Sequence, residues 1–104
     1  MNHVALSATL VERSALRYTP AGIPALDLRL AHESEVAEAG MPRKVSLEIA
    51  AVALGAWAEQ LVRQAVGTRL EVNGFLGKQR NGRGVVLHIT ACKAEATPSE
   101  TNRV

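Results

Sequence analysis

The sequence has little of what metal centres, disulfide scaffolds and active sites are built from. Cys92 is the single cysteine, which excludes an internal disulfide and a cysteine-based zinc site and suits a reducing cytoplasm. His3, His32 and His88 fall in separate segments without metal-ligand spacing, and the carboxylates form no convergent pair. No serine, nor Cys92, lies in a motif that would make it a nucleophile. We therefore expect no enzyme, no metal and no cofactor.

Long apolar runs are also absent. No stretch approaches the length needed to span a bilayer, and Glu12 and Arg13 interrupt the first apolar segment too early for a signal peptide. These features predict a cytoplasmic protein with no membrane partner.

Aromatic residues are scarce: Tyr18, Trp57 and Phe75 are the only ones in 104 residues. The 47% hydrophobic content, much of it alanine and valine, argues against global disorder but favours a small core. A second copy of the chain would bury more surface, so a dimer is an attractive arrangement. We expect one domain over residues 1–95 and a disordered tail over residues 96–104, which are polar and lack periodicity.

Acidic residues are missing from one long stretch. None lies between Gly74 and Lys93, whereas Glu33, Glu35 and Glu38 cluster in the middle of the chain. The formal net charge of +2 is therefore unevenly distributed. Outside the glutamate cluster the surface is cationic, which favours a polyanionic partner.

Alternating apolar and polar residues predict strands, and one segment changes period. In the first strand one face is apolar, and the other face has small, nearly uncharged side chains. The first strand of a second copy of the chain could cover this second face. In the third strand Val45 and Leu47 should face the core, and in the fifth Ala91 should point inward and Cys92 outward. Trp57 falls on the apolar stripe of the helix and should pack rather than stack on a ligand. The predicted strands are residues 2–11, 25–31, 44–50, 70–77 and 85–92, with a helix over 54–66.

Two segments that connect predicted strands have a composition that can be interpreted. Residues 32–43 contain Gly40, Pro42 and the three glutamates, so we expect a mobile polar loop. Residues 78–84 read KQRNGRG, in which the Asn81-Gly82 pair predicts a tight turn. Its cations could close over a polyanion, or could simply keep an edge hairpin soluble. The glycines here are no phosphate-binding fingerprint, because no helix starts after them.

The order strand, strand, strand, helix, strand, strand predicts a mainly β protein. It matches the OB-fold, a five-stranded Greek-key barrel with one helix between strands three and four. In that fold the outer face of strands two and three, with the adjoining loops, binds oligonucleotides.

Four segments carry a family resemblance: NHVALSATL, LRYTPAGIPALDLRLA, GTRLEVNGFL and VVLHI. Over residues 2–93 the chain resembles the single-stranded DNA-binding protein superfamily, and within it the short primosomal replication proteins. The chain ends soon after the barrel, without the glycine-rich linker and acidic tip of full-length single-stranded DNA-binding proteins, which favours the primosomal branch.

The resemblance implies a homodimer, joined through the first strand, that binds single-stranded DNA without sequence preference. It also implies contacts with a replication-restart helicase and other primosome proteins. Ser46 stands where the family can present an exposed tryptophan, which leaves open a protein-interaction scaffold with weak DNA binding. Transferred by position, the groove residues are Arg17, Arg29, Arg43, Lys44, Lys78, Arg80 and Arg83, with Tyr18 and Phe75 as stacking candidates.

Overall fold

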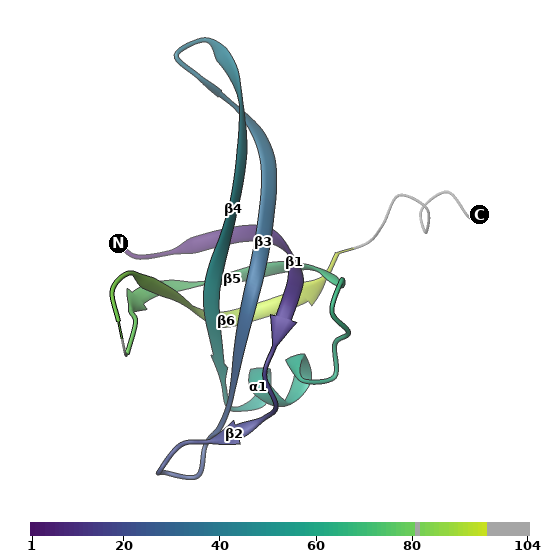
Figure 1. Cartoon of the computed structure of the whole chain (residues 1–104), viewed down its shortest axis with the longest axis vertical. Coiled ribbons are helices and arrows are strands. Elements are labelled where there is room, and N and C mark those ends of the chain that lie inside the picture. The colour runs from purple at the N-terminus through teal and green to yellow at the C-terminus, as the bar shows by residue number, and fades with distance from the viewer. Residues whose placement is uncertain (81, 96–104) are drawn as a thin grey trace, which may run out of the picture.

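A computed structural model describes residues 1–80 and 82–95. Asn81 of the expected turn and the expected tail over residues 96–104 lie outside the described residues. Figure 1 shows a barrel from which one long hairpin projects. The elements are β1 (Val4–Arg13), β2 (Arg17–Tyr18), β3 (Pro24–Glu38), β4 (Met41–Leu54), α1 (Ala56–Leu61), β5 (Arg69–Lys78) and β6 (Val85–Ala94).

The strands close into a five-stranded barrel. Their order is β1-β5-β6-β4-β3-β2, and an additional pairing of β1 with β3 joins the two sides of the sheet. All pairings are antiparallel except that of β4 with β6. One short helix lies between β4 and β5, so the predicted mainly β OB-fold is confirmed. The two-residue β2, which pairs with the start of β3, was not predicted.

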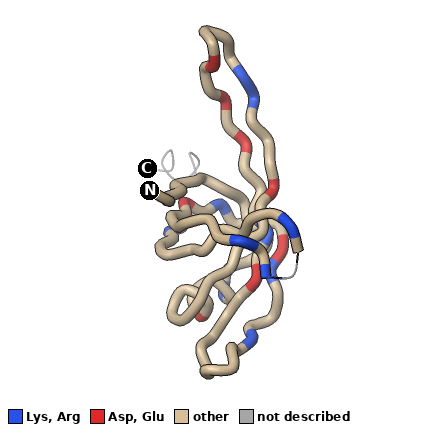
Figure 2. Tube along the Cα trace, turned by 90° about the vertical axis from the view of Figure 1, so that its left-hand side faces the viewer, with Lys and Arg blue, Asp and Glu red and all other residues tan. Residues whose placement is uncertain are grey.

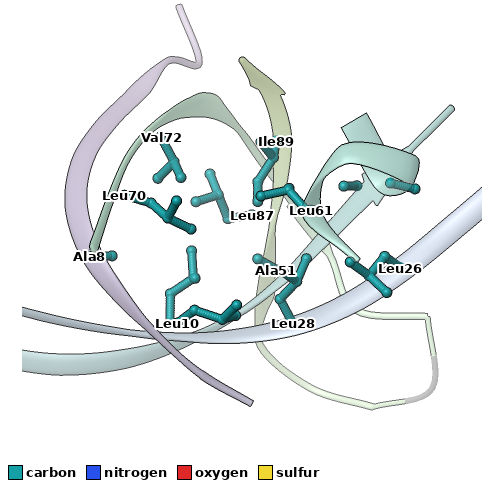
Figure 3. Packing of buried hydrophobic residues seen from close by; sticks show 13 residues of the cluster. Ala8, Leu10, Leu26, Leu28, Ala51, Leu61, Leu70, Val72, Leu87 and Ile89 are labelled. Atoms are coloured by element: carbon teal, nitrogen blue, oxygen red, sulfur yellow. The ribbon is translucent and has the colours of Figure 1, made fainter. Parts of the chain in front are cut away.

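The barrel is filled by aliphatic side chains from every long strand and from the helix. Leu10, Leu26, Leu30, Leu70 and Leu87 are completely or almost completely buried, and Figure 3 shows the cluster. Burial of this kind contributes about 1.5–3 kcal/mol for each leucine. The alternating leucines of β3 and the apolar face of the strand that contains Leu70 therefore point into the barrel.

Residues 32–43 are not the mobile loop that the sequence suggested. They continue β3 and β4 as a hairpin, which pairs in unbroken register from Ala25 opposite Leu54 to Glu38 opposite Met41. Ala39 and Gly40, both with positive φ, make the turn. Gly40 therefore joins two paired strands instead of interrupting regular structure. We call residues 32–47 the hairpin arm.

The arm also corrects the predicted core. Leu47 is 41% exposed and Val45 is only half-buried, because the arm extends β4 beyond the end of the barrel. The buried residues of β4 are instead Ala51 and Ala53. Their small side chains fit where β4 crosses between β3 and β6.

Two further predictions are wrong, namely the bounds of the helix and the direction in which Cys92 points. The helix covers only Ala56–Leu61 rather than residues 54–66, because β4 extends to Leu54 and turns begin at Val62. Trp57 nevertheless packs against the core, as predicted. In β6 an irregularity opposite Asn73 and Gly74 inserts one extra residue, which reverses the alternation. Cys92 therefore packs against the core instead of pointing outward.

No helix within the described part of the chain has the length and apolar character needed to cross a bilayer.

Candidate nucleic-acid interface

An open groove lies on the outer face of β4 and β6. It has a volume of about 460 Å³. Alternation along β4 builds its floor: Ala51 and Ala53 are buried in the barrel, so Ala50 and Val52 point outward. The parallel pairing of Val52 with His88 continues the floor onto β6. The floor is thus made largely of small apolar side chains, over which a flat ligand can lie.

Polar and cationic side chains form the two rims of the groove. One rim comes from β2 and the start of β3 and holds Arg17, Thr19 and Asp27. The other comes from the end of β5 and the loop after it and holds Lys78, Gln79 and Arg80. A chain lying along the floor would therefore meet a cation on either side, which suits a flexible polyanion with apolar groups.

The β2 rim is partly neutralised by an ion pair. The Arg17 guanidinium donates two hydrogen bonds to the Asp27 carboxylate, at 2.7 Å and 3.0 Å. These bonds hold the pKa of Asp27 below its ordinary value and raise the pKa of Arg17, with desolvation opposing both effects. Both side chains stay partly exposed, 42% for Arg17 and 53% for Asp27. Arg17 can thus reach a phosphate, but it must share its charge with Asp27.

The opposite rim carries unshared charge. We call residues 78–84 the basic loop. Among the described residues, Lys78, Arg80 and Arg83 have no carboxylate within ion-pair distance. Gln79 fixes the base of this loop, because its backbone N–H donates to the Gly84 carbonyl and its side-chain amide to the Val85 carbonyl. Arg83 does not line the groove, although it belongs to the same loop.

Arg29 lies beside the groove rather than in it. It faces an adjoining hollow that shares Asp27, Leu28 and Ala50 with the groove. Its guanidinium is 3.7 Å from the Glu48 carboxylate, a loose contact. Arg29 therefore extends the rim of Arg17 toward the hairpin arm.

Arg43 and Lys44 are not brought to the groove. Both lie on the hairpin arm, where Figure 2 shows acidic positions along one strand and a basic segment on the strand beside it. Arg43 is 3.2 Å from Glu38, and Lys44 stands opposite Glu35 in the β3–β4 register. A second hollow, of about 400 Å³, lies at the base of the arm and is lined by Glu33, Glu48 and Arg69, of which Arg69 is paired with Glu95. Carboxylates at this position disfavour a polyanion.

The two stacking candidates differ in their surroundings. Tyr18 is 64% exposed on β2, next to Arg17, but does not line the groove. Phe75 is 41% exposed and stacks on His88, with ring centroids 4.7 Å apart and an interplanar angle of 4°. Ser46 is exposed on the arm, away from the groove lining.

Sequence reasoning missed several groove residues. The sequence suggests His88 only as a candidate metal ligand and gives no role to Asp27. The signal for His88 was present: pairing the fourth and fifth strands across the basic loop places it directly opposite Phe75. Thr19, Gln79, Ala50 and Val52 carried no comparable signal, because they line the groove only once β4 and β6 pair in parallel.

Fold and groove together define an OB-fold protein of the single-strand-binding class. The family described as "Another single-strand binding protein family" matches residues 2–91. The "Replication restart protein PriB" of Bordetella pertussis is 55% identical over 80 residues, which are 77% of this chain and 75% of the relative. The chain therefore belongs to the PriB family of replication restart proteins, whose members are DNA-binding proteins and not enzymes.

Solved structures agree with this assignment. The protein priB from Ralstonia solanacearum, solved at 1.8 Å, is 38% identical and superposes with a TM-score of 0.85 over 92% of this chain and 99% of that one. The wild-type single-stranded DNA binding protein from Thermus aquaticus is 29% identical, with a TM-score of 0.75 over 95% of this chain and 52% of that one. Both similarities extend over nearly the whole barrel.

Proposed function

We propose that this protein binds single-stranded DNA in the groove, without sequence preference, and thereby assists replication restart. The observation that carries the proposal is the small apolar floor between two cationic rims. Bases of an open strand can lie on Ala50, Val52 and Val86 while the phosphates reach Arg17 and the basic loop. A duplex keeps its bases stacked inside and gains only the phosphate contacts.

The distribution of polar and apolar side chains supports sequence-tolerant binding. The cationic side chains stand on the rims, where they can follow phosphates, whereas the floor beneath the bases is largely apolar. Each neutralised phosphate releases counterions, so affinity should fall steeply with salt.

Fluorescence anisotropy with a labelled oligothymidine tests this proposal. We expect saturable binding at low salt, weaker binding at moderate salt, and little competition from a duplex of the same length. Oligomers of mixed sequence should bind with similar affinity. Competition by duplex as strong as by single strand, or no binding at either salt, would overturn the proposal.

We further propose that the protein acts as a homodimer joined through β1. Residues 4–9 of β1 pair with β5, whereas only residues 9–13 pair with β3. Within the described chain, the second edge of residues 4–8 is thus without a strand partner. A twin β1 could pair there and would cover the exposed Ala5 and Ser7. Sedimentation should show a dimer that a proline at Ser7 disrupts; a wild-type monomer at micromolar concentration would contradict this.

The contact with a restart helicase and other primosome proteins is likewise a proposal, supported by the replication restart family to which the chain belongs. A replication protein of this kind would work in the cytoplasm. One observation favours the alternative of a scaffold with weak DNA binding: Val36, Met41 and Leu47 expose apolar surface on the hairpin arm. Helicase capture that is independent of DNA and resistant to salt would support such a scaffold.

A further inference from the structure

His88 and Phe75 form a two-ring stack on the outer face of the barrel. They are direct cross-strand partners in the β5–β6 register. Their rings lie nearly parallel, with centroids 4.7 Å apart. The stack is thus set by strand pairing rather than by a loop, which fixes the position of the imidazole.

Gly77 leaves room for this arrangement. A Cβ atom built at position 77 would lie 2.9 Å from Nε2 and 3.1 Å from Cδ2 of His88. The imidazole therefore extends over the backbone of β5, where any larger residue would displace it. Gly77 has no positive φ, so close approach is the only feature of the structure that calls for glycine here.

The imidazole keeps surface that a ligand can contact. Phe75 covers one face of the ring, and His88, unlike Phe75, also lines the groove. Within residues 1–80 and 82–95, no hydrogen bond holds either ring nitrogen of His88, whereas His32 is bonded at both of its nitrogens. The charged groups that line the same groove are Arg17, Asp27, Lys78 and Arg80.

We propose that His88, backed by Phe75 above Gly77, is a platform on which a base of the bound strand stacks. This inference rests on the proposed function and adds the residue that contacts a base. It places the stacking surface on β5 and β6, while Ser46 on the arm supplies none. Stacking on a side-chain ring tolerates every base, in keeping with binding that ignores sequence.

An abasic oligomer of equal length separates stacking from charge, because it keeps the phosphates and lacks the bases. We expect His88→Ala to weaken oligothymidine binding about five- to thirtyfold, within the range for loss of a stacked base. Binding of the abasic strand should stay within about twofold of wild type. His88→Phe should recover most of the affinity for oligothymidine, since a phenyl ring also stacks.

His3→Ala is the matched control, because His3 is exposed and outside the groove lining. Phe75→Leu is a second variant, which keeps an apolar side chain but removes the backing ring, and should give a smaller loss on oligothymidine alone. Circular dichroism melting confirms that each variant is folded.

Equal affinities of wild type and His88→Ala for oligothymidine would overturn the platform while leaving the groove intact. Equal losses on both strands, or no recovery with a folded His88→Phe, would also overturn it. Wild-type protein that binds neither strand would instead overturn the proposed function itself.

Discussion

The basic loop and the hairpin arm both carry cations, but only one of them offers these cations to a ligand. On the arm Arg43 contacts Glu38, and Lys44 faces Glu35 across the strand pair. In the loop, Lys78, Arg80 and Arg83 lie in a stretch without a single carboxylate. The comparison teaches that the distance from a cation to the nearest acid matters more for phosphate binding than the number of cations.

The arm and the barrel also differ in how they are held together, although β3 and β4 run through both. Leu30 is fully buried where β3 belongs to the barrel, whereas Val36 is 46% exposed on the arm. Leu30→Ala should lower the free energy of unfolding by about 2–5 kcal/mol, since it leaves a cavity. Val36→Ala should change it by less than about 0.5 kcal/mol. Urea denaturation measures both, and equal effects would mean that the arm is part of the core.

Removing two charges from each region tests the charge comparison directly. The double variant Arg80→Ala with Arg83→Ala should weaken oligothymidine binding about 10- to 50-fold at low salt. It should also make the slope of log affinity against log salt shallower by about 1.4, the value for two phosphates on a single strand.

Arg43→Ala with Lys44→Ala is its matched control, because it removes the same net charge from the arm. We expect an affinity change of less than about threefold and an almost unchanged salt slope, since these cations already neutralise glutamates. Similar slopes for the two double variants would show that overall charge, and not its pairing, decides binding.

Asp27→Asn should have the smallest effect and the opposite sign. It frees the Arg17 guanidinium from its carboxylate, so affinity for oligothymidine should rise about two- to fourfold, as anisotropy at constant salt can show. The charge-matched control is Glu71→Gln, which removes one carboxylate that lies 3.9 Å from Lys93 and outside the groove. A loss of affinity in Asp27→Asn would mean that Asp27 positions Arg17 instead of competing for it.

The same pair predicts a pH dependence of stability. The pKa of Asp27 is lowered in the folded state, so its contribution to stability is present above the ordinary aspartate pKa of about 3.9. That contribution is lost as the pH falls through the lower folded-state value. Since both side chains are partly exposed, the effect should be small, and Asp27→Asn should lose it. Thermal melts between pH 2 and pH 6 would fail to support this if wild type and variant lost stability in parallel.

The barrel could be predicted from the sequence because its strands alternate and its leucines face one way. Leu26, Leu28 and Leu30 alternate with polar residues, and all three are buried in the barrel. The arm could not be predicted, because its glutamates and Gly40 resemble a loop in composition. Only the cross-strand register shows that they form a hairpin.

The residues of the groove could likewise be predicted only in part. Arg17, Lys78 and Arg80 were predicted and do line it, because the resemblance carried their positions. Arg43 and Lys44 were predicted alongside them but are separated from the groove by the length of the arm, which local patterns do not encode. The Phe75–His88 stack and the β6 irregularity before Cys92 depend on pairing between strands, so single-strand alternation missed both.

The central claim is that single-stranded DNA lies in the groove and not along the arm. Titration of the isotope-labelled protein with oligothymidine, followed by backbone amide chemical shifts, tests it most directly. The account predicts shifts at Val52, His88 and Lys78, with little change at Val36 or Met41 near the tip of the arm. Shifts concentrated on the arm, with the groove amides unmoved, would contradict it.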